Sequence, residues 1–515
     1  MSDLDAWRSF HRIHDLVDRL PDLAGEEVII RALDHVFTGN ELKAAVDSAE
    51  TALRAHGIRQ GDRVLLVNEN CAALCVLIFA VSRIGAWSAI VNARIAKAEI
   101  DRIAAHCKAR ARFYTGAISE PAAAMAVADG ADDIDLGPTT GIQATPAVDE
   151  VPEAGEPEDG SAVAVLLYTS GTTGQPKGVM LTHWNLLFTA QRSAELRGTK
   201  PGERTLGVLP ISHVFGLSSV FIGTVFGAGE LILRSRFVPR DIADLLENDD
   251  VTIFQGVPAM YAHFLELATV RGTPMAPPKI RYTSAGGAPL DLSIKQRIEA
   301  MWKVQLKNGY GLTETTAGVC ATTLEYPADD DSVGVLFKSV EARIVDANTL
   351  EDMPNGEIGE FWVRSPGNMK GYYHNPEETA KVLLPDGWYR TGDFAKRTAD
   401  GYFYIVGRLK ELIIRSGFNV YPIDVETALN SHPDVALSAV VGRSVDGNEE
   451  VVAFVQPIAG RTITMEALRA HAEASLAPYK RPSEYIFSDN LPVTPAGKIL
   501  KNSLREEAQT RAAAG

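Results

Sequence analysis

Between residues 41 and 111, helical and strand patterns alternate along the chain, and this alternation restricts the possible folds more than any other feature. The stretch ELKAAVDSAETALRAHG repeats apolar residues at near-helical spacing and reaches Gly57, which suits the end of a helix. A short apolar run, DRVLLVN, predicts a strand, and a helix over 72–84 and a strand at WSAIVN follow it. A strand–helix–strand order of this kind predicts a largely parallel sheet with helices on its faces.

The same alternation resumes after a stretch rich in Ala, Pro, Gly, Asp and Glu between residues 119 and 161. We interpret the end of that stretch, TPAVDEVPEAGEPEDGSA, as a solvated connector and not as a domain. The strands expected beyond it are AVAVLLY, ERTLGVLP, ELILR, VTIFQGVP and KIRYTSAGG, with helical segments between them.

Beyond about residue 332 the pattern changes to shorter alternating strands, namely VEARIVD, GEIGEFWVRS and GYFYIVGR. Such strands are typical of a small antiparallel barrel or sheet. From residue 411 we expect an α+β segment with helices near 423–432 and 464–476 and strands at VALSAVVG and EEVVAFVQP. We expect the last residues, QTRAAAG, to be frayed.

The composition restricts the classes of function. With 66 Asp and Glu against 50 Lys and Arg, the net charge of −16 argues against nucleic-acid partners and against attraction to anionic lipid. The start, MSDLDAWRSF, shows no secretory leader, and the most apolar stretch, 71–91, is interrupted by Ser82 and Arg83. We therefore expect a buried helix there and no membrane span. Four scattered cysteines indicate reduced core thiols in a cytoplasmic protein. The length of 515 residues suggests two or three packed units.

The stretch YTSGTTGQPKG directly follows the predicted strand AVAVLLY. Its glycines allow positive φ and a close approach of the backbone to a ligand, and its hydroxyl groups add donors. Lys177 adds one cation, so the stretch can form a nest for a polyphosphate. It differs from the common P-loop, since Lys177 is followed by Gly178 and not by Ser or Thr. A flexible surface loop is the competing interpretation.

YTSGTTGQPKGV resembles the signature of the adenylate-forming superfamily, which comprises acyl-CoA synthetases, luciferases and peptide-synthetase adenylation domains. Four further motifs of that superfamily follow in its order: GYGLTET (309–315), YRTGD (389–393), GRLKELIIRSGFNVYP (407–422) and PAGKILK (495–501). The resemblance covers residues from about 31 to 507, nearly the whole chain.

The resemblance implies an α/β fold with a large N-terminal domain, residues 1–409, of two mixed sheets with flanking helices plus a small β-barrel over 332–406. It also implies a small mobile α+β lid domain, 410–515, with its hinge at Lys410. The implied reaction has two halves. A carboxylate attacks the α-phosphate of ATP to give an acyl-adenylate and pyrophosphate, and a thiol, usually that of coenzyme A, then attacks the mixed anhydride. ATP, Mg²⁺ and coenzyme A are the implied cofactors, and a homodimer is an open possibility.

The resemblance also assigns roles to single residues. Thr313 is expected to donate to the α-phosphate and Glu314 to bind Mg²⁺, while Asp393 accepts the ribose hydroxyls. Lys498 is expected to contact both the attacking carboxylate and the α-phosphate, whereas Lys501 is expected to be a solubilising residue. The implied residues for nucleotide and coenzyme A are Thr169, Ser170, Gly171, Thr172, Thr173, Gly174, Lys177, Gly286, Gly287, Ala288, Asp393, Arg408, Gly417 and Phe418.

The acyl pocket is expected to be apolar and deeper than acetate requires. Gly311 lies where acetate-activating relatives carry a bulky Trp, which favours a medium or long acyl chain or an aryl acid. Arg281 is near in sequence, so a second carboxylate on the substrate stays open. His213 is expected at the carboxylate end of the pocket, with a buried structural histidine as the equally weighted alternative. The expected pocket residues are His213, Phe215, Ser284, Gly309, Tyr310, Gly311 and Val319.

Three alternatives to an acyl- or aryl-CoA ligase stay open at this point. No carrier segment follows Lys498, which disfavours a peptide-synthetase module, but a separate carrier protein could still be the acceptor. It could be a luciferase-like oxygenase, whose motifs would be the same. A non-catalytic adenylate-binding module is disfavoured, since such a module would have no need of Lys498.

Overall fold

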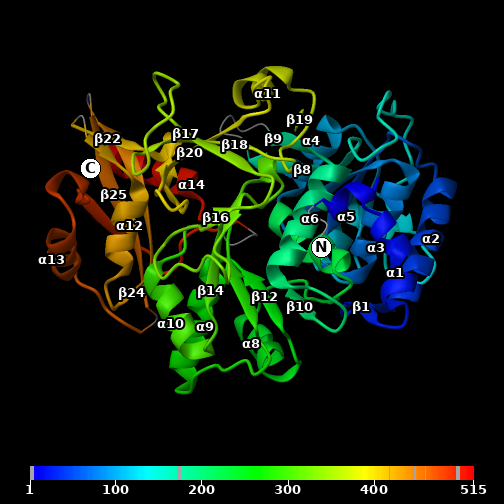
Figure 1. The fold of residues 1–515 in the computed structure, drawn as a ribbon, viewed down its shortest axis with the longest axis horizontal. Coiled ribbons are helices and arrows are strands. Elements are labelled where there is room, and N and C mark those ends of the chain that lie inside the picture. Colours follow the sequence, from blue (N-terminus) through cyan, green and yellow to red (C-terminus); the bar gives the residue numbers. More distant parts are fainter. Residues whose placement is uncertain are drawn as a thin grey trace.

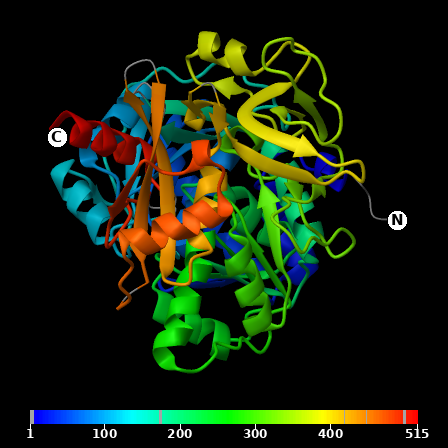
Figure 2. The same ribbon diagram turned by 90° about the vertical axis from the view of Figure 1, so that its left-hand side faces the viewer.

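The computed structural model describes residues 5–170, 176–416, 418–445, 448–458, 460–494 and 499–514. Figure 1 shows that the chain runs along the long axis of the molecule, from α1 and α2 at one end to the C-terminal elements at the other. In Figure 2 the C-terminal elements face the viewer. The predicted α/β fold with several mixed sheets is confirmed.

Two large mixed sheets form the centre of the fold. In spatial order, the first contains β16 (Val335–Leu336), β15 (Cys320–Ala321), β14 (Leu306–Tyr310), β13 (Tyr282–Ala285), β12 (Ile253–Gly256), β10 (Arg204–Gly207), β11 (Glu230–Leu233), β1 (Val28–Arg31) and β2 (Val36–Thr38). The second contains β19 (Gly371–Tyr372), β9 (Pro176–Thr182), β8 (Val163–Ser170), β4 (Trp87–Asn92), β3 (Arg63–Asn68), β5 (Ala109–Tyr114), β7 (Gln143–Ala144) and β6 (Asp132–Asp133).

The helices of this part connect and cover the strands. They are η1 (Ala6–Ser9), α1 (Asp15–Ala24), α2 (Gly39–Ala55), α3 (Ala72–Ile84), α4 (Lys97–His106), α5 (Glu120–Ala128), α6 (His183–Arg197), η2 (Phe215–Ile222), α7 (Gly223–Phe226), α8 (Pro239–Asn248), α9 (Pro258–Arg271), α10 (Leu292–Trp302) and η3 (Thr313–Thr315). Helix α3 is apolar on almost all sides and nearly fully buried, as expected from the 71–91 stretch. All four cysteines are buried and free of disulfides.

The predicted strand–helix–strand unit is confirmed: β3, α3 and β4 lie where expected, and β3 and β4 pair in parallel. Gly57, with a φ of 92°, follows the end of α2 as predicted. The predicted β-rich segment is an antiparallel sheet of β17 (Glu341–Val345), β18 (Gly359–Arg364), β20 (Tyr389–Arg397) and β21 (Phe403–Arg408), flanked by α11 (Pro376–Val382). Its edge strands β17 and β21 do not pair with each other in the described residues, so the structure shows an open sheet at the place of the expected barrel.

The C-terminal α+β segment begins with the short helix η4 (Leu409–Glu411). Its other elements are β22 (Ile413–Arg415), β23 (Phe418–Val420), α12 (Pro422–Asn430), β24 (Val435–Val445), β25 (Asn448–Pro457), α13 (Met465–Ser475), η5 (Pro478–Lys480), β26 (Glu484–Phe487) and α14 (Lys501–Ala514). The helices and strands expected here are confirmed within a few residues.

The stretch expected to be frayed is helical as far as it is described, since helix α14 continues to Ala514. Leu504 and Ala508, four residues apart on one helix face just before this stretch, are buried in an apolar cluster with β24 and β25, whereas residues 509–512 are exposed. Gly515 lies outside the described residues. In the described ranges, no helix is both long and apolar enough to span a membrane.

Candidate active site

The Gly- and Thr-rich stretch connects two paired strands, β8 and β9. Thr169 of β8 lies opposite Lys177 of β9, and both line a cavity of about 920 Å³. The predicted phosphate donors Gly171, Thr172, Thr173 and Gly174 lie outside the described residues, and only the backbone of Ser170 is described. Both ends of the stretch therefore meet the cavity.

Lys177 is held by contacts that sequence reasoning missed. Its ammonium lies 2.5 Å from a carboxylate oxygen of Glu378 in α11 and 5.2 Å from the ring centre of Tyr372. Lys177, and Lys381 to a smaller degree, lower the pKa of Glu378 to about 2. The ion pair keeps the Lys177 side chain at the cavity, where an anionic ligand would compete with Glu378 for it.

Thr313 and Glu314 form the short helix η3 directly after β14, and both line the cavity. The hydroxyl of Tyr372 donates to Oε1 of Glu314 at 2.9 Å. Burial, together with the charge of Glu314, raises the pKa of Tyr372, so its hydroxyl keeps its proton and remains a donor. One oxygen of Glu314 is thereby oriented, and an oriented carboxylate on the cavity wall offers the oxygen donor that Mg²⁺ prefers.

Asp393 and Arg408 pair across β20 and β21. Nε of Arg408 lies 3.1 Å from Oδ1 of Asp393, and the hydroxyl of Tyr310 donates to Oδ2 at 2.5 Å. Burial works to lower the pKa of Arg408, but the charges of Asp393, Glu411 and other neighbouring groups together outweigh it, and the pKa is raised. Tyr310, which was expected in the acyl pocket, thus directs its hydroxyl to the residue expected to bind ribose.

The segment after β13 contributes Gly286 and Gly287 to the cavity wall. A Cβ on Gly286 would lie 3.2 Å from the ring of Phe215, and Gly287 has a φ of 81°. The backbone conformation thus favours glycine at 287, and a side chain at 286 would require the ring of Phe215 to shift. Among the described residues of the cavity wall, Ala288 does not occur.

The expected acyl residues His213, Phe215, Ser284, Gly309, Tyr310 and Gly311 all line the same cavity. Nδ1 of His213 accepts a hydrogen bond from the backbone N–H of Phe215 at 3.3 Å. Val319 is fully buried in the apolar core, and the described wall includes its neighbours Gly318 and Cys320 instead.

The structure gives Gly311 a different reason from the expected one. A Cβ at this position would lie 1.0 Å from the carbonyl oxygen of Ala317. The path of the backbone after η3, where Thr316 and Ala317 have positive φ, therefore requires glycine here, and this local cause adds to the expected one.

The possibility that Arg281 binds a second substrate carboxylate is also wrong. Arg281 is half-exposed, and its guanidinium pairs with Glu203 at 2.8 Å. It also donates to the carbonyl groups of Arg197 and Gly198, which lie at the end of α6. These contacts engage the guanidinium away from the cavity wall.

The C-terminal segment closes one side of the cavity. Lys410 and Glu411 of η4 line it, as do Thr494 and Ile499, which flank the expected catalytic lysine in sequence. Lys498 and Gly417 lie outside the described residues. Phe418 is 55% exposed and stacks on Tyr479 with 4.8 Å between ring centres.

The interpretation of Lys501 as a solubilising residue is wrong. Its ammonium lies 2.8 Å from Glu426 and 3.2 Å from Glu411, and its side chain is 20% exposed. These two carboxylates outweigh burial and raise the pKa of Lys501. The lysine therefore ties α14 to η4 and α12.

The contacts of Glu378 explain why sequence reasoning missed it. In the sequence NPEET, Glu378 looks like a first-turn residue of a capped helix, and Asn375 does accept a hydrogen bond from its N–H at 3.1 Å. The capping pattern does not indicate the second role of Glu378, its ion pair with Lys177, which exists because β9 lies close to α11.

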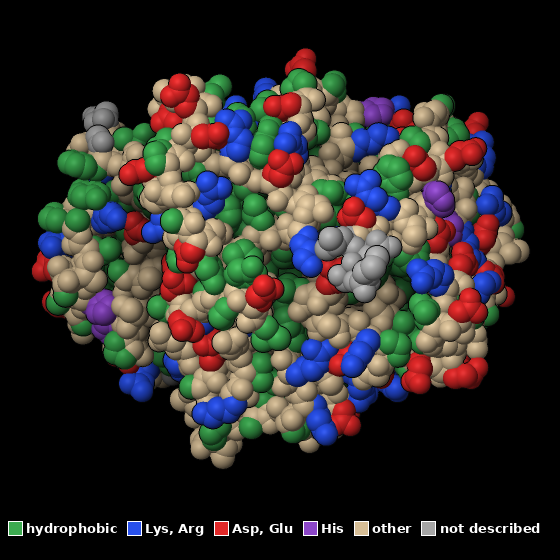
Figure 3. All heavy atoms as spheres, in the orientation of Figure 1, with side chains coloured by type: hydrophobic (Ala, Val, Ile, Leu, Met, Phe, Trp, Pro, Cys, Tyr) green, Lys and Arg blue, Asp and Glu red, His purple; other side chains and the backbone are tan. Residues whose placement is uncertain are grey.

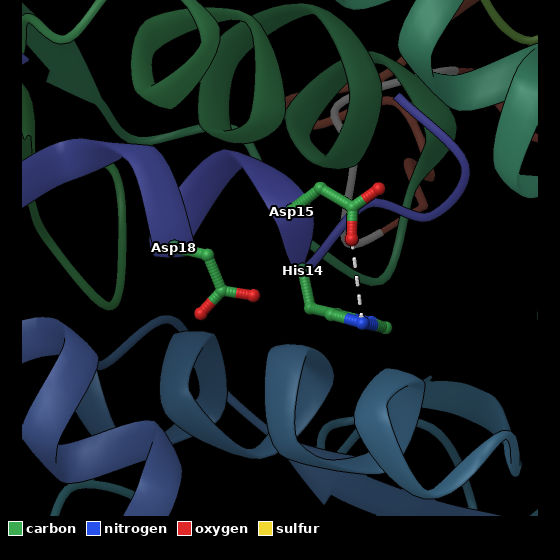
Figure 4. Close-up of side chains that lie close together, drawn as sticks. All are labelled: His14, Asp15 and Asp18. Atoms are coloured by element: carbon green, nitrogen blue, oxygen red, sulfur yellow. Dashed lines mark ion pairs between the residues drawn. The ribbon is translucent and has the colours of Figure 1, made fainter. Parts of the chain in front are cut away.

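One group of three possible metal ligands, His14, Asp15 and Asp18, is found in the described residues, far from Glu314 in sequence. Figure 4 shows His14 beside Asp15, with Asp18 further along α1. Asp15 accepts from the backbone of His11 and Arg12, Asp18 pairs with Arg83, and Nδ1 of His14 contacts Ser82. These contacts give the group a structural explanation.

On the face drawn in Figure 3, positive and negative side chains are interspersed.

Comparison with known proteins adds to this geometry. The model of the family "AMP-binding enzyme" matches residues 23–373, and that of the "AMP-binding enzyme C-terminal domain" matches 424–498. A feruloyl-CoA synthase of an Amycolatopsis species is 36% identical over 473 residues, which cover 91% of this chain and 93% of that protein. A long-chain-fatty-acid–CoA ligase of Bacillus subtilis (strain 168) is 38% identical over 349 residues, 67% of this chain and 62% of that protein. The structure of O-succinylbenzoate coenzyme A synthetase from Bacillus subtilis with ATP and a magnesium ion matches with a TM-score of 0.80 and 26% identity, covering 95% of this chain and 98% of that one.

Proposed function

The chain belongs to the family of AMP-binding enzymes, and from this premise we propose that it joins a carboxylic acid to coenzyme A through an acyl-adenylate. One observation carries the proposal. Lys177, Glu314, Asp393 and Arg408 come from distant parts of the sequence and line one cavity, so two cations and two carboxylates would be available there to a magnesium-bound nucleotide. The named activities of the relatives, feruloyl-CoA synthase and fatty-acid–CoA ligase, support it.

In the first half-reaction, an oxygen of the substrate carboxylate forms a bond to the α-phosphorus of ATP, and the bond from that phosphorus to the bridging oxygen breaks. Pyrophosphate leaves with the electron pair. Thr169, Lys177 and the 170–174 stretch would hold the outer phosphates, and Thr313 would donate to the α-phosphate. Lys498 would contact both reacting anions, and His213 would lie at the carboxylate end of the acid. Positioning and charge neutralisation are what this step requires.

Glu314 is the residue that would bind Mg²⁺, and the bound ion would neutralise charge on the phosphate oxygens. Asp393 would accept the ribose hydroxyls. Its own geometry is fixed by Tyr310 and Arg408, so it does not need to reorient when the nucleotide binds. Gly286 and Gly287, which line the cavity, would border the adenine.

In the second half-reaction, the thiol sulfur of coenzyme A bonds to the acyl carbon, the bond to the AMP oxygen breaks, and the thiol proton passes to solvent. We propose that the chain divides at residues 409 and 410 and that the C-terminal domain rotates about Lys410 between the two steps. Gly417 and Phe418 would then border the pantetheine channel. The exposure of Phe418 supports this role, since an exposed aromatic ring is available to a ligand.

A screen of carboxylic acids tests the proposal. Pyrophosphate release is measured over fatty acids of increasing length and over benzoate- and cinnamate-type acids, with and without coenzyme A, and thioester is identified by mass. We expect a medium- or long-chain or an aryl acid to release pyrophosphate and to form a thioester when coenzyme A is present. Adenylate without thioester would favour a carrier protein as acceptor, and oxygen uptake would favour the luciferase-like alternative.

A further inference from the structure

Helix α11 places a carboxylate beside Lys177. Strand β19 pairs antiparallel with β9, and Tyr372 lies opposite Val179. Lys177 precedes Val179 by two residues on β9, and α11 begins three residues beyond the end of β19. The strand pairing therefore brings the first turn of α11 close to Lys177, and Glu378 of that turn reaches its ammonium.

Two cations share the carboxylate of Glu378. Oε2 lies 2.5 Å from Nζ of Lys177, and Oε1 accepts a hydrogen bond from Lys381, three residues further along α11. The side chains of Lys177 and Glu378 are 19% and 31% exposed, whereas that of Lys381 is 67% exposed. Both lysines line the cavity, but the described part of its wall does not include Glu378. Glu378 therefore acts on a ligand in the cavity through the lysines that it holds.

The ring of Tyr372 supports the ammonium of Lys177. Nζ lies 5.2 Å from the ring centre, a distance typical of a cation–π contact. The hydroxyl of Tyr372 donates to Glu314 at 2.9 Å, so the ring is fixed at both ends of this chain of contacts. Lys177 is thus held beside the carboxylate that is proposed to bind Mg²⁺.

We propose that Glu378 is a positioning residue that binds Lys177 between turnovers and weakens the retention of pyrophosphate, the product of the first half-reaction. A phosphate in the cavity has to take the ammonium from Glu378, so the observed affinity is reduced by the fraction of molecules in which Lys177 is free. When pyrophosphate leaves, Lys177 returns to Glu378. The inference rests on the proposed function and assigns control of product release to a residue outside the cavity wall.

Lys381 makes this exchange less costly. A carboxylate that loses its only cation keeps an uncompensated charge, but Glu378 retains Lys381 when Lys177 leaves it. The ammonium of Lys381 is largely exposed, so solvent and salt screen its direct attraction to a bound anion. The main effect of Lys381 is therefore to set how tightly Glu378 holds Lys177.

Calorimetry with inorganic pyrophosphate and Mg²⁺, on the full-length protein without acid or nucleotide, tests the exchange. Glu378→Gln releases Lys177 from its carboxylate, so we expect the Kd of pyrophosphate to fall about fivefold or more. In turnover assays, the inhibition constant of pyrophosphate against ATP should fall by a similar factor. Damage to the fold would weaken binding, so tighter binding cannot result from a merely structural role.

A double-mutant cycle with Lys381→Met separates the exchange from direct attraction. Without Lys381, Glu378 has Lys177 as its remaining partner in the cluster, so we expect the Kd of pyrophosphate to rise about threefold. In the Glu378→Gln background the same change should have no effect, because no carboxylate then competes for Lys177. An equal rise of the Kd in both backgrounds would mean that Lys381 attracts the anion directly and would contradict the exchange.

Glu377→Gln is the matched control, since it removes the same charge from the neighbouring, exposed position of α11. Its Kd for pyrophosphate should equal that of the wild type. The inference is overturned if Glu378→Gln binds pyrophosphate no more tightly than the wild type, or if Glu377→Gln tightens binding to the same extent.

Binding of ATP to the wild type keeps this inference separate from the proposed function. A wild-type protein that binds neither ATP nor pyrophosphate would refute both. A wild-type protein that binds ATP and releases pyrophosphate, but whose Kd for pyrophosphate does not respond to Glu378→Gln, would refute the exchange alone.

Discussion

At the scale of single residues, Lys177 on the cavity wall and the buried Arg197 differ in how they are held. Lys177 has a carboxylate partner in Glu378, whereas Arg197 is held by an amide and a carbonyl. A paired cation can exchange its partner for an incoming phosphate at little electrostatic cost, and a buried unpaired one gains from any acceptor that arrives.

The ion pair of Lys177 and Glu378 predicts a pH dependence of stability. The pKa of Glu378 is lowered from its ordinary value of 4.5 to about 2, so the carboxylate contributes stability that is fully present above pH 4.5. That contribution is lost as the pH falls through 2. In urea unfolding, Glu378→Gln should have a lower midpoint than the wild type at pH 7 and at pH 5, and the difference should shrink by pH 3.

Glu377→Gln is the control for this experiment. It removes the same charge from the neighbouring, exposed position of α11, while Lys177 pairs with Glu378. Its unfolding midpoint should match that of the wild type at each pH. An equal effect of both variants, or a difference that grows toward acid, would contradict the assignment.

Lys498→Ala tests the residue proposed to contact both reacting anions. We expect pyrophosphate release to slow by about 10²–10³-fold, the usual scale for loss of one donor to a transition state. Binding of ATP, measured by calorimetry, should change far less, since the phosphate and ribose contacts remain. A rate of pyrophosphate release close to that of the wild type would contradict the role.

Sequence reasoning was able to group residues of one cavity where the signal is local to a motif. Glu314, Asp393 and Arg408 lie in short strings whose order along the chain is informative, and the structure brings all three to one cavity. It failed where the cause lies in a segment far away in sequence. Nothing near Gly311 in the string GYGLTET shows that the carbonyl of Ala317 folds back onto it, and nothing near Arg197 indicates that Gln255 will be its partner.

At the scale of elements, α3 and β4 were predictable to the residue, because a continuous apolar run and the Gly85 that ends the helix mark their limits. Helix α14 was not, since its buried positions Leu504 and Ala508 are separated by polar residues and their partner strand, β24, lies far back in the chain. Whether the edge strands β17 and β21 pair to close a barrel likewise depends on which strands meet in space. The alternation of residues along each strand does not reveal that pairing.

The ion pairs of Lys501 predict how far this residue stabilises the C-terminal segment. It joins α14 to η4 and α12 through Glu411 and Glu426, so Lys501→Met would leave two carboxylates close together without their cation. Since the pair is partly exposed, we expect a loss of about 2 kcal/mol in the stability of the C-terminal segment, between the values for surface and for buried pairs. Hydrogen exchange should quicken in α14 and β24 and stay unchanged in β3 and β4. Unchanged protection of α14 would contradict the role.

At the scale of the whole molecule, several parts of the fold together form the wall of the cavity. Residues of both large sheets, of the open β-sheet and of the C-terminal segment line it, and the C-terminal contribution begins at Lys410. Lys501, Glu411 and Glu426 all lie after that residue, so their ion pairs hold the C-terminal segment together without fixing it to the rest. Rotation about Lys410 would preserve these pairs and would change which residues face the acyl carbon.

Lys410→Pro tests this rotation, because proline fixes φ near −65° and removes the backbone freedom that a hinge requires. We expect the variant to keep pyrophosphate release within a few-fold of the wild type and to lose thioester formation, measured by mass in the presence of coenzyme A. Lys410→Ala removes the same side chain but leaves the backbone free, so it should retain both half-reactions. If Lys410→Pro lost both half-reactions equally, or if Lys410→Ala lost the thioester step alone, the side chain or the local fold would be responsible, and the proposed hinge would have to be abandoned.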